Sequence, residues 1–77
     1  MNHIDLTQTA EPVRAFHKAL RDEPKGTFIA YHEGPCLHNV TRKPVGKAVQ
    51  EAYEKKRCIP VQKRVSDGVY RYFAVVM

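Results

Sequence analysis

This chain of 77 residues contains little of what membrane-embedded and secreted proteins require. None of its apolar runs approaches the roughly 18 residues of a membrane-spanning helix. Its first residues, MNHIDLTQTAEP, lack the basic and then apolar pattern of a secretory signal. The sequence therefore predicts a cytoplasmic protein without a membrane partner.

Cysteine is scarce, since the chain has only Cys36 and Cys58 and no CxxC motif. The stretch YHEGPCLH brings His32, Cys36 and His38 close together in sequence. With Cys58 they would supply four zinc ligands, but their separations match no standard Cys/His knuckle. In a reducing compartment the thiols are expected to stay free. We therefore predict a fold without zinc, without a disulfide and without any other cofactor.

Residues arranged for catalysis are also few. Ser66 is the single serine, and the sequence has no GxSxG, no HExxH, no Gly-rich phosphate loop and no paired-carboxylate motif. Cys36, with His32 or His38 as its base, is the one candidate for nucleophilic chemistry. No oxyanion donor or orienting third residue can be identified for it. The sequence predicts a protein that is not an enzyme.

The charged residues are unevenly distributed along an otherwise ordinary globular composition. With 43% hydrophobic and 27% charged residues, the chain is expected to form one domain over residues 1–77, in which residues 1–8 are a candidate flexible segment. Residues 1–40 carry four Lys/Arg against five Asp/Glu, and residues 41–77 carry nine against three. Net charges of −1 and +6 make up the +5 of the chain. This asymmetry indicates a polyanionic partner.

Hydrophobic spacing predicts two helices. The first spans residues 10–22 and takes Thr9 as its cap. The second spans residues 44–57, with Thr41 or Lys43 before Pro44 at the first helical position. Its apolar stripe is expected to face the core and consists of Val45, Ala48, Val49 and Ala52.

Strand-forming residues predict a strand over residues 27–32, a strand or a loop over residues 36–41, and a hairpin over residues 59–76. The expected fold class is α+β in the order αβαββ, with two helices packed on a short antiparallel sheet. Tyr70 and Tyr72 are expected to pack on the helices, with base stacking as the alternative. If the hairpin loop has two residues, five more side chains would face the helices: Ile59, Val61, Val65, Ala74 and Val76.

The stretch VQKRVSDGVYRYF predicts two strands joined at Asp67 and Gly68. A two-residue loop would place Arg64 opposite Arg71, and a three-residue loop would place Lys63 there. Either cationic pair costs up to about 1 kcal/mol, so Arg71→Gln is expected to leave stability unchanged or slightly improved. Such cations also discourage edge-to-edge aggregation in proteins that bind nothing there. A bound anion would instead turn the repulsion into attraction.

The segment TRKPVGKAVQEAYEKKRCIPVQKRVSDGVYRYFAVV, residues 41–76, resembles the recognition helix and wing of winged-helix DNA-binding domains. The resemblance implies a helix in the major groove and a hairpin along the backbone or the minor groove. The family has a separate helix before the recognition helix, and residues 33–43 show little helical pattern. The implied nucleic-acid contacts are Arg42, Lys43, Lys47, Gln50, Lys63, Arg64 and Arg71.

These features lead us to expect a small basic regulatory module that binds nucleic acid, DNA in preference to RNA. Glu51 and Glu54 would repel phosphates, so contact with the backbone is expected rather than base readout. The alternative is a small protein-binding modulator or inhibitor, of a phage type, that docks its basic face on an acidic or nucleic-acid-processing partner. The sequence does not indicate an oligomeric state.

Overall fold

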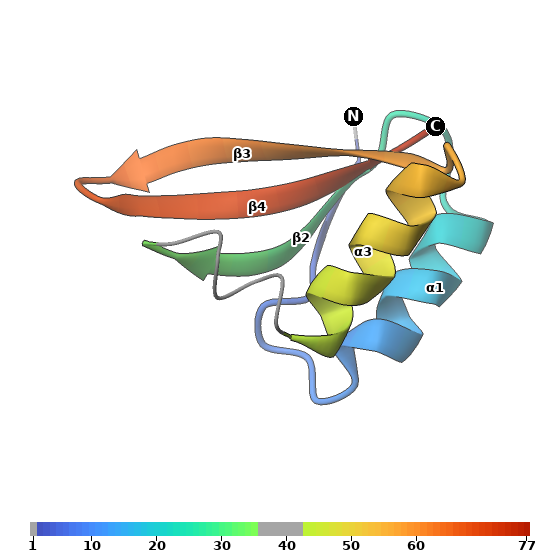
Figure 1. Cartoon of the computed structure of the whole chain (residues 1–77), viewed down its shortest axis with the longest axis horizontal. Helices are drawn as coiled ribbons and strands as arrows, with labels where there is room; N and C mark the ends of the chain where they lie inside the picture. The colour runs from blue at the N-terminus through green and yellow to red at the C-terminus, as the bar shows by residue number, and fades with distance from the viewer. Residues whose placement is uncertain (1, 36–42) are drawn as a thin grey trace.

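The computed structural model describes residues 2–35 and 43–77, which form a four-stranded sheet and two helices (Figure 1). The elements are β1 (His3–Asp5), α1 (Pro12–Asp22), β2 (Phe28–Gly34), α3 (Pro44–Glu54), β3 (Cys58–Ser66) and β4 (Val69–Val76). The strand order is β1-β2-β4-β3. Strand β1 is parallel to β2, and the other neighbours are antiparallel. The predicted α+β class is confirmed, although the sheet is mixed rather than antiparallel.

The start of the chain forms an edge strand where a flexible segment was expected. His3 lies opposite Phe28 and Asp5 lies opposite Ala30. Leu6 is buried just beyond this strand, and its N–H donates to the Ala30 carbonyl at 2.7 Å. A strand of three residues is too short to produce a detectable hydrophobic period. Pairing with β2 and the burial of Leu6 thus tie residues 3–6 to the rest of the domain.

Both helices begin at a proline and end close to the predicted positions. Glu11 precedes α1 and makes no side-chain capping bond, so the prediction of Thr9 as the cap is wrong. Lys43 precedes α3, also without a side-chain cap. Helix α3 ends at Glu54 because Lys56 turns into the left-handed region, with φ of 60°. The predicted end at residue 57 was three residues too late.

The core lies between the two helices and one face of the sheet. The predicted stripe of α3 is buried, which confirms that it faces the core, and Gly46 is buried with it. Tyr72 is also in the core, and Tyr70 packs against it, as expected. The rest of the chain contributes Leu6, Phe16, Ala19, Leu20, Ile29, Tyr31, Cys58, Ala74 and Val76.

Three side chains that were expected in the core are exposed instead. Ile59, Val61 and Val65 retain 45%, 37% and 46% of their accessible surface. Side chains alternate between the two faces of a strand, and the buried Cys58 at the start of β3 faces the helices. Ile59 and Val61 therefore lie on the opposite face, which the two helices do not cover.

The β3–β4 hairpin combines the two registers that were expected. Ser66 lies opposite Val69, as for a two-residue loop, but beyond a register shift the pairing is that of a three-residue loop. Gly68 has φ of +69°, but among the described residues Lys56 is the only non-glycine with positive φ, so a type I′ turn is ruled out. Lys63 lies opposite Arg71, and the register shifts between Arg64 and Ser66. At the other end, the Met77 N–H donates to the Arg57 carbonyl at 3.0 Å. Strand β3, which contains Pro60, is an edge of the sheet.

The buried position of Leu6 can be tested by truncation. Leu6→Ala is expected to lower the free energy of unfolding by about 2 to 5 kcal/mol, because it removes buried methyl groups and leaves a cavity. Gln8→Ala, at an exposed position two residues further on, is the matched control and should have little effect. Chemical denaturation measures both. Equal, small effects would mean that the start of the chain contributes no packing.

Candidate functional site

The loop end of the β3–β4 hairpin extends past both helices (Figure 1). We refer to residues 61–71 as the hairpin arm. Every residue of the arm up to Gly68 is exposed, because neither of the two described helices packs against this part of β3. The arm carries three of the cations that the sequence predicted as contacts: Lys63, Arg64 and Arg71.

Two of these three cations have carboxylate partners. Arg64 donates to Asp67 across the turn. Arg71 donates through Nε to Glu33 Oε2 at 2.8 Å, and its Nη2 lies 2.6 Å from the same oxygen. Glu33 is on β2, directly opposite Arg71. The repulsion expected between Arg71 and Lys63 is therefore offset by Glu33, and the expectation that Arg71→Gln is harmless no longer holds.

The cations predicted on the second helix are divided between two surfaces. Lys47 and Gln50 are exposed and line a shallow hollow on α3 together with Gly46 and Glu51. Lys43 instead points into a cavity at the start of α3, and Arg71 lines the same cavity. Arg42 lies outside the described residues. Lys43 and Arg71, which are far apart in the sequence, thus line the same cavity, although they contact different partners there.

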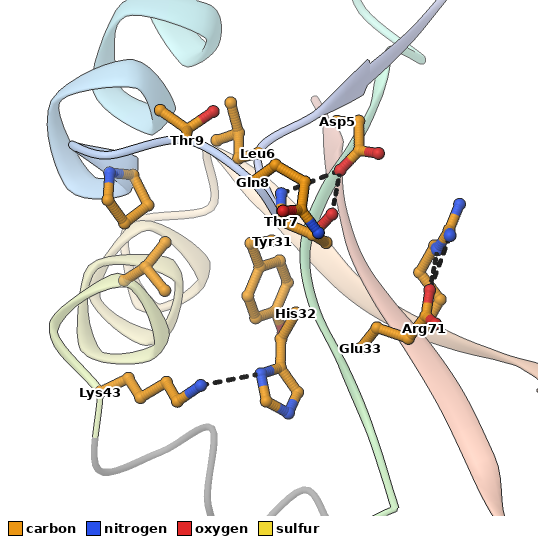
Figure 2. A pocket seen from close by; sticks show the side chains of 12 residues that line it. Asp5, Leu6, Thr7, Gln8, Thr9, Tyr31, His32, Glu33, Lys43 and Arg71 are labelled. Carbon is orange, nitrogen blue, oxygen red and sulfur yellow. Dashed lines mark hydrogen bonds and ion pairs between the residues drawn. The ribbon is translucent and has the colours of Figure 1, made fainter.

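This cavity has a volume of about 470 Å³ and lies at the ends of β1 and β2, next to the start of α3 (Figure 2). A bulge in β2 between Ala30 and His32 lets both Tyr31 and His32 line it. Figure 2 shows Lys43 reaching toward His32, while Glu33 and Arg71 pair away from them. The remaining charged side chain is Asp5.

The ionisable groups of the cavity are perturbed by burial and by their neighbours. Partial burial lowers the pKa of His32, and the nearby Lys43, whose Nζ lies 3.5 Å from Nδ1, lowers it further. Hydrogen bonds from the hydroxyl and the backbone N–H of Thr7 lower the pKa of Asp5. Burial raises the pKa of Tyr31 to about 12. At neutral pH the cavity therefore holds two cations, two carboxylates and a neutral imidazole.

This balance of charge limits what the cavity can bind. Asp5 and Glu33 would repel a polyanion and so offset its attraction to Lys43 and Arg71. Cys36 and His38, the predicted nucleophile and one of its candidate bases, lie outside the described residues. The cavity is suited to a small polar group of mixed charge rather than to a nucleic-acid backbone.

Cys58 packs as a small apolar side chain. Its thiol is buried, donates to the Val49 carbonyl at 3.8 Å, and has its pKa raised by that burial. Among the described residues, no three His, Cys, Asp or Glu side chains are placed to hold a metal ion. Two of the four candidate zinc ligands in the sequence, Cys36 and His38, lie outside the described residues.

Comparisons with other proteins found no counterpart: no family model, curated protein or solved structure matches this chain. The winged-helix resemblance thus remains an interpretation of residues 41–76. Within residues 2–35 and 43–77, neither helix is long and apolar enough to cross a membrane.

One surface was missed by the sequence argument. The face of the sheet turned away from the helices, here called the outer face, carries a cluster of rings. The His3 and Phe28 rings stack with centroids 5.3 Å apart, and Phe28 and Phe73 meet edge to face at 5.6 Å. The sequence pattern that could have predicted this surface is the run of apolar residues at consecutive positions in β2 and β4. Such runs indicate strands with two apolar faces.

The Arg71–Glu33 pair can be tested by substitution. Arg71→Gln should lower the free energy of unfolding by up to about 1 kcal/mol, because it removes a half-exposed ion pair between two strands. Lys63→Gln, at the facing position, removes a like charge and should leave stability unchanged or slightly higher. A double-mutant cycle with Glu33→Gln, followed by urea denaturation, measures the coupling. A coupling energy of zero would mean that the Arg71–Glu33 pair does not stabilise the fold.

The lowered pKa of His32 predicts a pH effect with a definite sign. The unfolded chain binds a proton at His32 more readily than the folded protein, so stability should fall as pH drops below about 6.5. Lys43→Gln should raise the His32 pKa part of the way to its ordinary value, measured by NMR titration. Lys47→Gln, on the same helix but outside the cavity, should not change it. A His32 pKa that is the same in Lys43→Gln and in the wild-type protein would contradict this arrangement.

Proposed function

We propose that this protein is a cytoplasmic module that binds nucleic acid through the hairpin arm and performs no catalysis. The observation that supports this most is the exposed arm itself, which projects past the helices with Lys63 and Arg64 near its end (Figure 1). A two-stranded ribbon of this kind fits the major groove of B-form DNA, which is about 12 Å wide. Its cations would then lie beside phosphates.

The ion pair at the turn does not prevent this use of Arg64. The side chains of Arg64 and Asp67 are 62% and 98% exposed. Pairs this exposed contribute about 0 to 1 kcal/mol, so a phosphate can replace Asp67 as the partner of Arg64. Charge-assisted bonds from Arg to phosphate are stronger than neutral ones. Arg71, held by Glu33, is assigned a structural role instead.

In this proposal helix α3 contacts the nucleic-acid backbone beside the hairpin arm. Lys47 and Gln50 are exposed, but Glu51 and Glu54 share the solvent side of the same helix and would repel phosphates. Contacts of this kind fix position on the backbone and carry little sequence information. DNA is preferred over RNA as the partner because the deep, narrow major groove of A-form RNA excludes side chains.

A second candidate function is supported by a different observation. Ile59, Val61 and Val65 are exposed along β3. Several large apolar side chains on one exposed strand favour docking of a protein, so a protein-binding modulator is the alternative.

Binding to duplex and single-stranded oligonucleotides at two salt concentrations tests the proposal. Affinity should fall steeply with salt, since each neutralised phosphate releases counterions. The double variant Lys63→Gln/Arg64→Gln should weaken binding to every sequence. It should also lower the salt slope by about one for each phosphate that is no longer neutralised.

The matched control is Lys18→Gln/Lys25→Gln, which removes the same charge from exposed positions outside the arm. It should retain most of the affinity. Binding that is absent, insensitive to salt, or reduced equally by both pairs of substitutions would favour the protein-binding alternative.

A further inference from the structure

The outer face of the sheet has an apolar centre. Pairing of the strands defines two neighbouring rows across it. The first row consists of His3, Phe28, Val75 and Ile59, and the second consists of Asp5, Ala30, Phe73 and Val61. Six of these eight side chains are apolar, and they come from three adjacent strands.

Neither described helix covers this face. Both α1 and α3 contribute to the core on the other side, together with Ile29 and Ala74. Figure 1 shows the two helices side by side next to the sheet. Antiparallel strands with one solvated face normally carry polar residues there. Within the two rows Ala30 and Phe73 are buried by their neighbours, Phe28 and Val75 are half-buried, and Ile59 and Val61 are exposed. Adjacent apolar side chains that stay accessible on a small domain mark an interaction surface.

Charges on the outer face are separated by sign. The next row along the strands contains Glu33, Arg71 and Lys63. Carboxylates therefore lie on the β1–β2 half of the face, at Asp5 and Glu33. Cations lie on the β4–β3 half, at Arg71 and Lys63. The carboxylates would repel a phosphate backbone from the β1–β2 half of this face.

This separation makes the outer face complementary to itself. A twofold axis parallel to the strands brings the β1–β2 half of one copy against the β4–β3 half of the other. Asp5 of one copy then faces the half of its neighbour that carries Lys63, while Glu33 and Arg71 stay paired within each copy. We propose that a second copy of this chain packs on the outer face, with sheets about 10 Å apart as in other sandwiches.

In this arrangement Lys63 of one copy reaches Asp5 of the other. The two residues differ by two positions along the strand direction, an offset of about 7 Å that the flexible lysine stem can span. The two hairpin arms would point the same way. The proposal shares Lys63 with the proposed nucleic-acid contact, but it does not depend on that contact, because it rests on the apolar rows of the outer face and on Asp5.

Sedimentation or light scattering across a range of concentrations tests the association. The wild-type protein should reach twice its monomer mass of 8.8 kDa. Val61→Lys should give the monomer mass, because it places a charge in the apolar centre. Gln62→Lys adds the same charge at the next residue, on the opposite face of β3, and should still dimerise. Circular dichroism confirms that both variants are folded.

A charge exchange tests the twofold arrangement itself. Asp5→Lys and Lys63→Glu should each weaken self-association at low salt, since each places like charges at both contacts between positions 5 and 63. Mixing the two variants should restore the dimer mass, because both cross-contacts then join opposite charges. A wild-type monomer at all concentrations, or equal dimerisation of Val61→Lys and Gln62→Lys, would overturn the proposal. A mixture of folded variants that stays monomeric would also overturn it.

Discussion

Strand β4 has neighbours on both sides, and the rest of the structure depends on that position. Its pairing with β2 joins the last residues of the chain to a strand from the first half, with Ala74 opposite Ile29. Its pairing with β3 builds the hairpin. Alternate residues of β4 complete the core on one side and the outer face on the other. Because the pairing with β2 is distant in sequence, its closure entropy must be recovered by the burial that it allows.

The elements that could be predicted are those with a local cause. The period of apolar residues in α3 and the proline at its start are sequence signals, as is the Asp67-Gly68 turn. The register of the hairpin was not predictable, because both loop lengths suit those two residues and the choice depends on packing. The sequence did not predict strand β1, because this strand of three residues depends on its pairing with β2. The exposure of Ile59 and Val61 depends on the register of β3 against β4, so it could not be predicted until that register was known.

The candidate site shows the same division. Lys63, Arg64 and Arg71 were predicted to gather, and the hairpin brings them together because they are close in sequence. The partner of Arg71 is Glu33, 38 residues away, and no local pattern relates the two. The cavity shared by Lys43 and Arg71 likewise requires the order of strands in the sheet. Sequence therefore indicated which charges lie on the arm, but the pairing of β2 with β4 decides which of them are available to a ligand.

Pro60 gives the edge of the sheet a further property. The bond from Met77 to Arg57 fixes the alternation of the ladder, so the backbone groups of Cys58, Pro60 and Gln62 point outward from β3. Pro60 has no N–H, which leaves a gap in that row of donors where an added strand would need one. A β-strand from another molecule thus cannot continue the sheet along its full edge. The fold resists open-ended, fibril-like growth even though apolar side chains of β3 remain exposed.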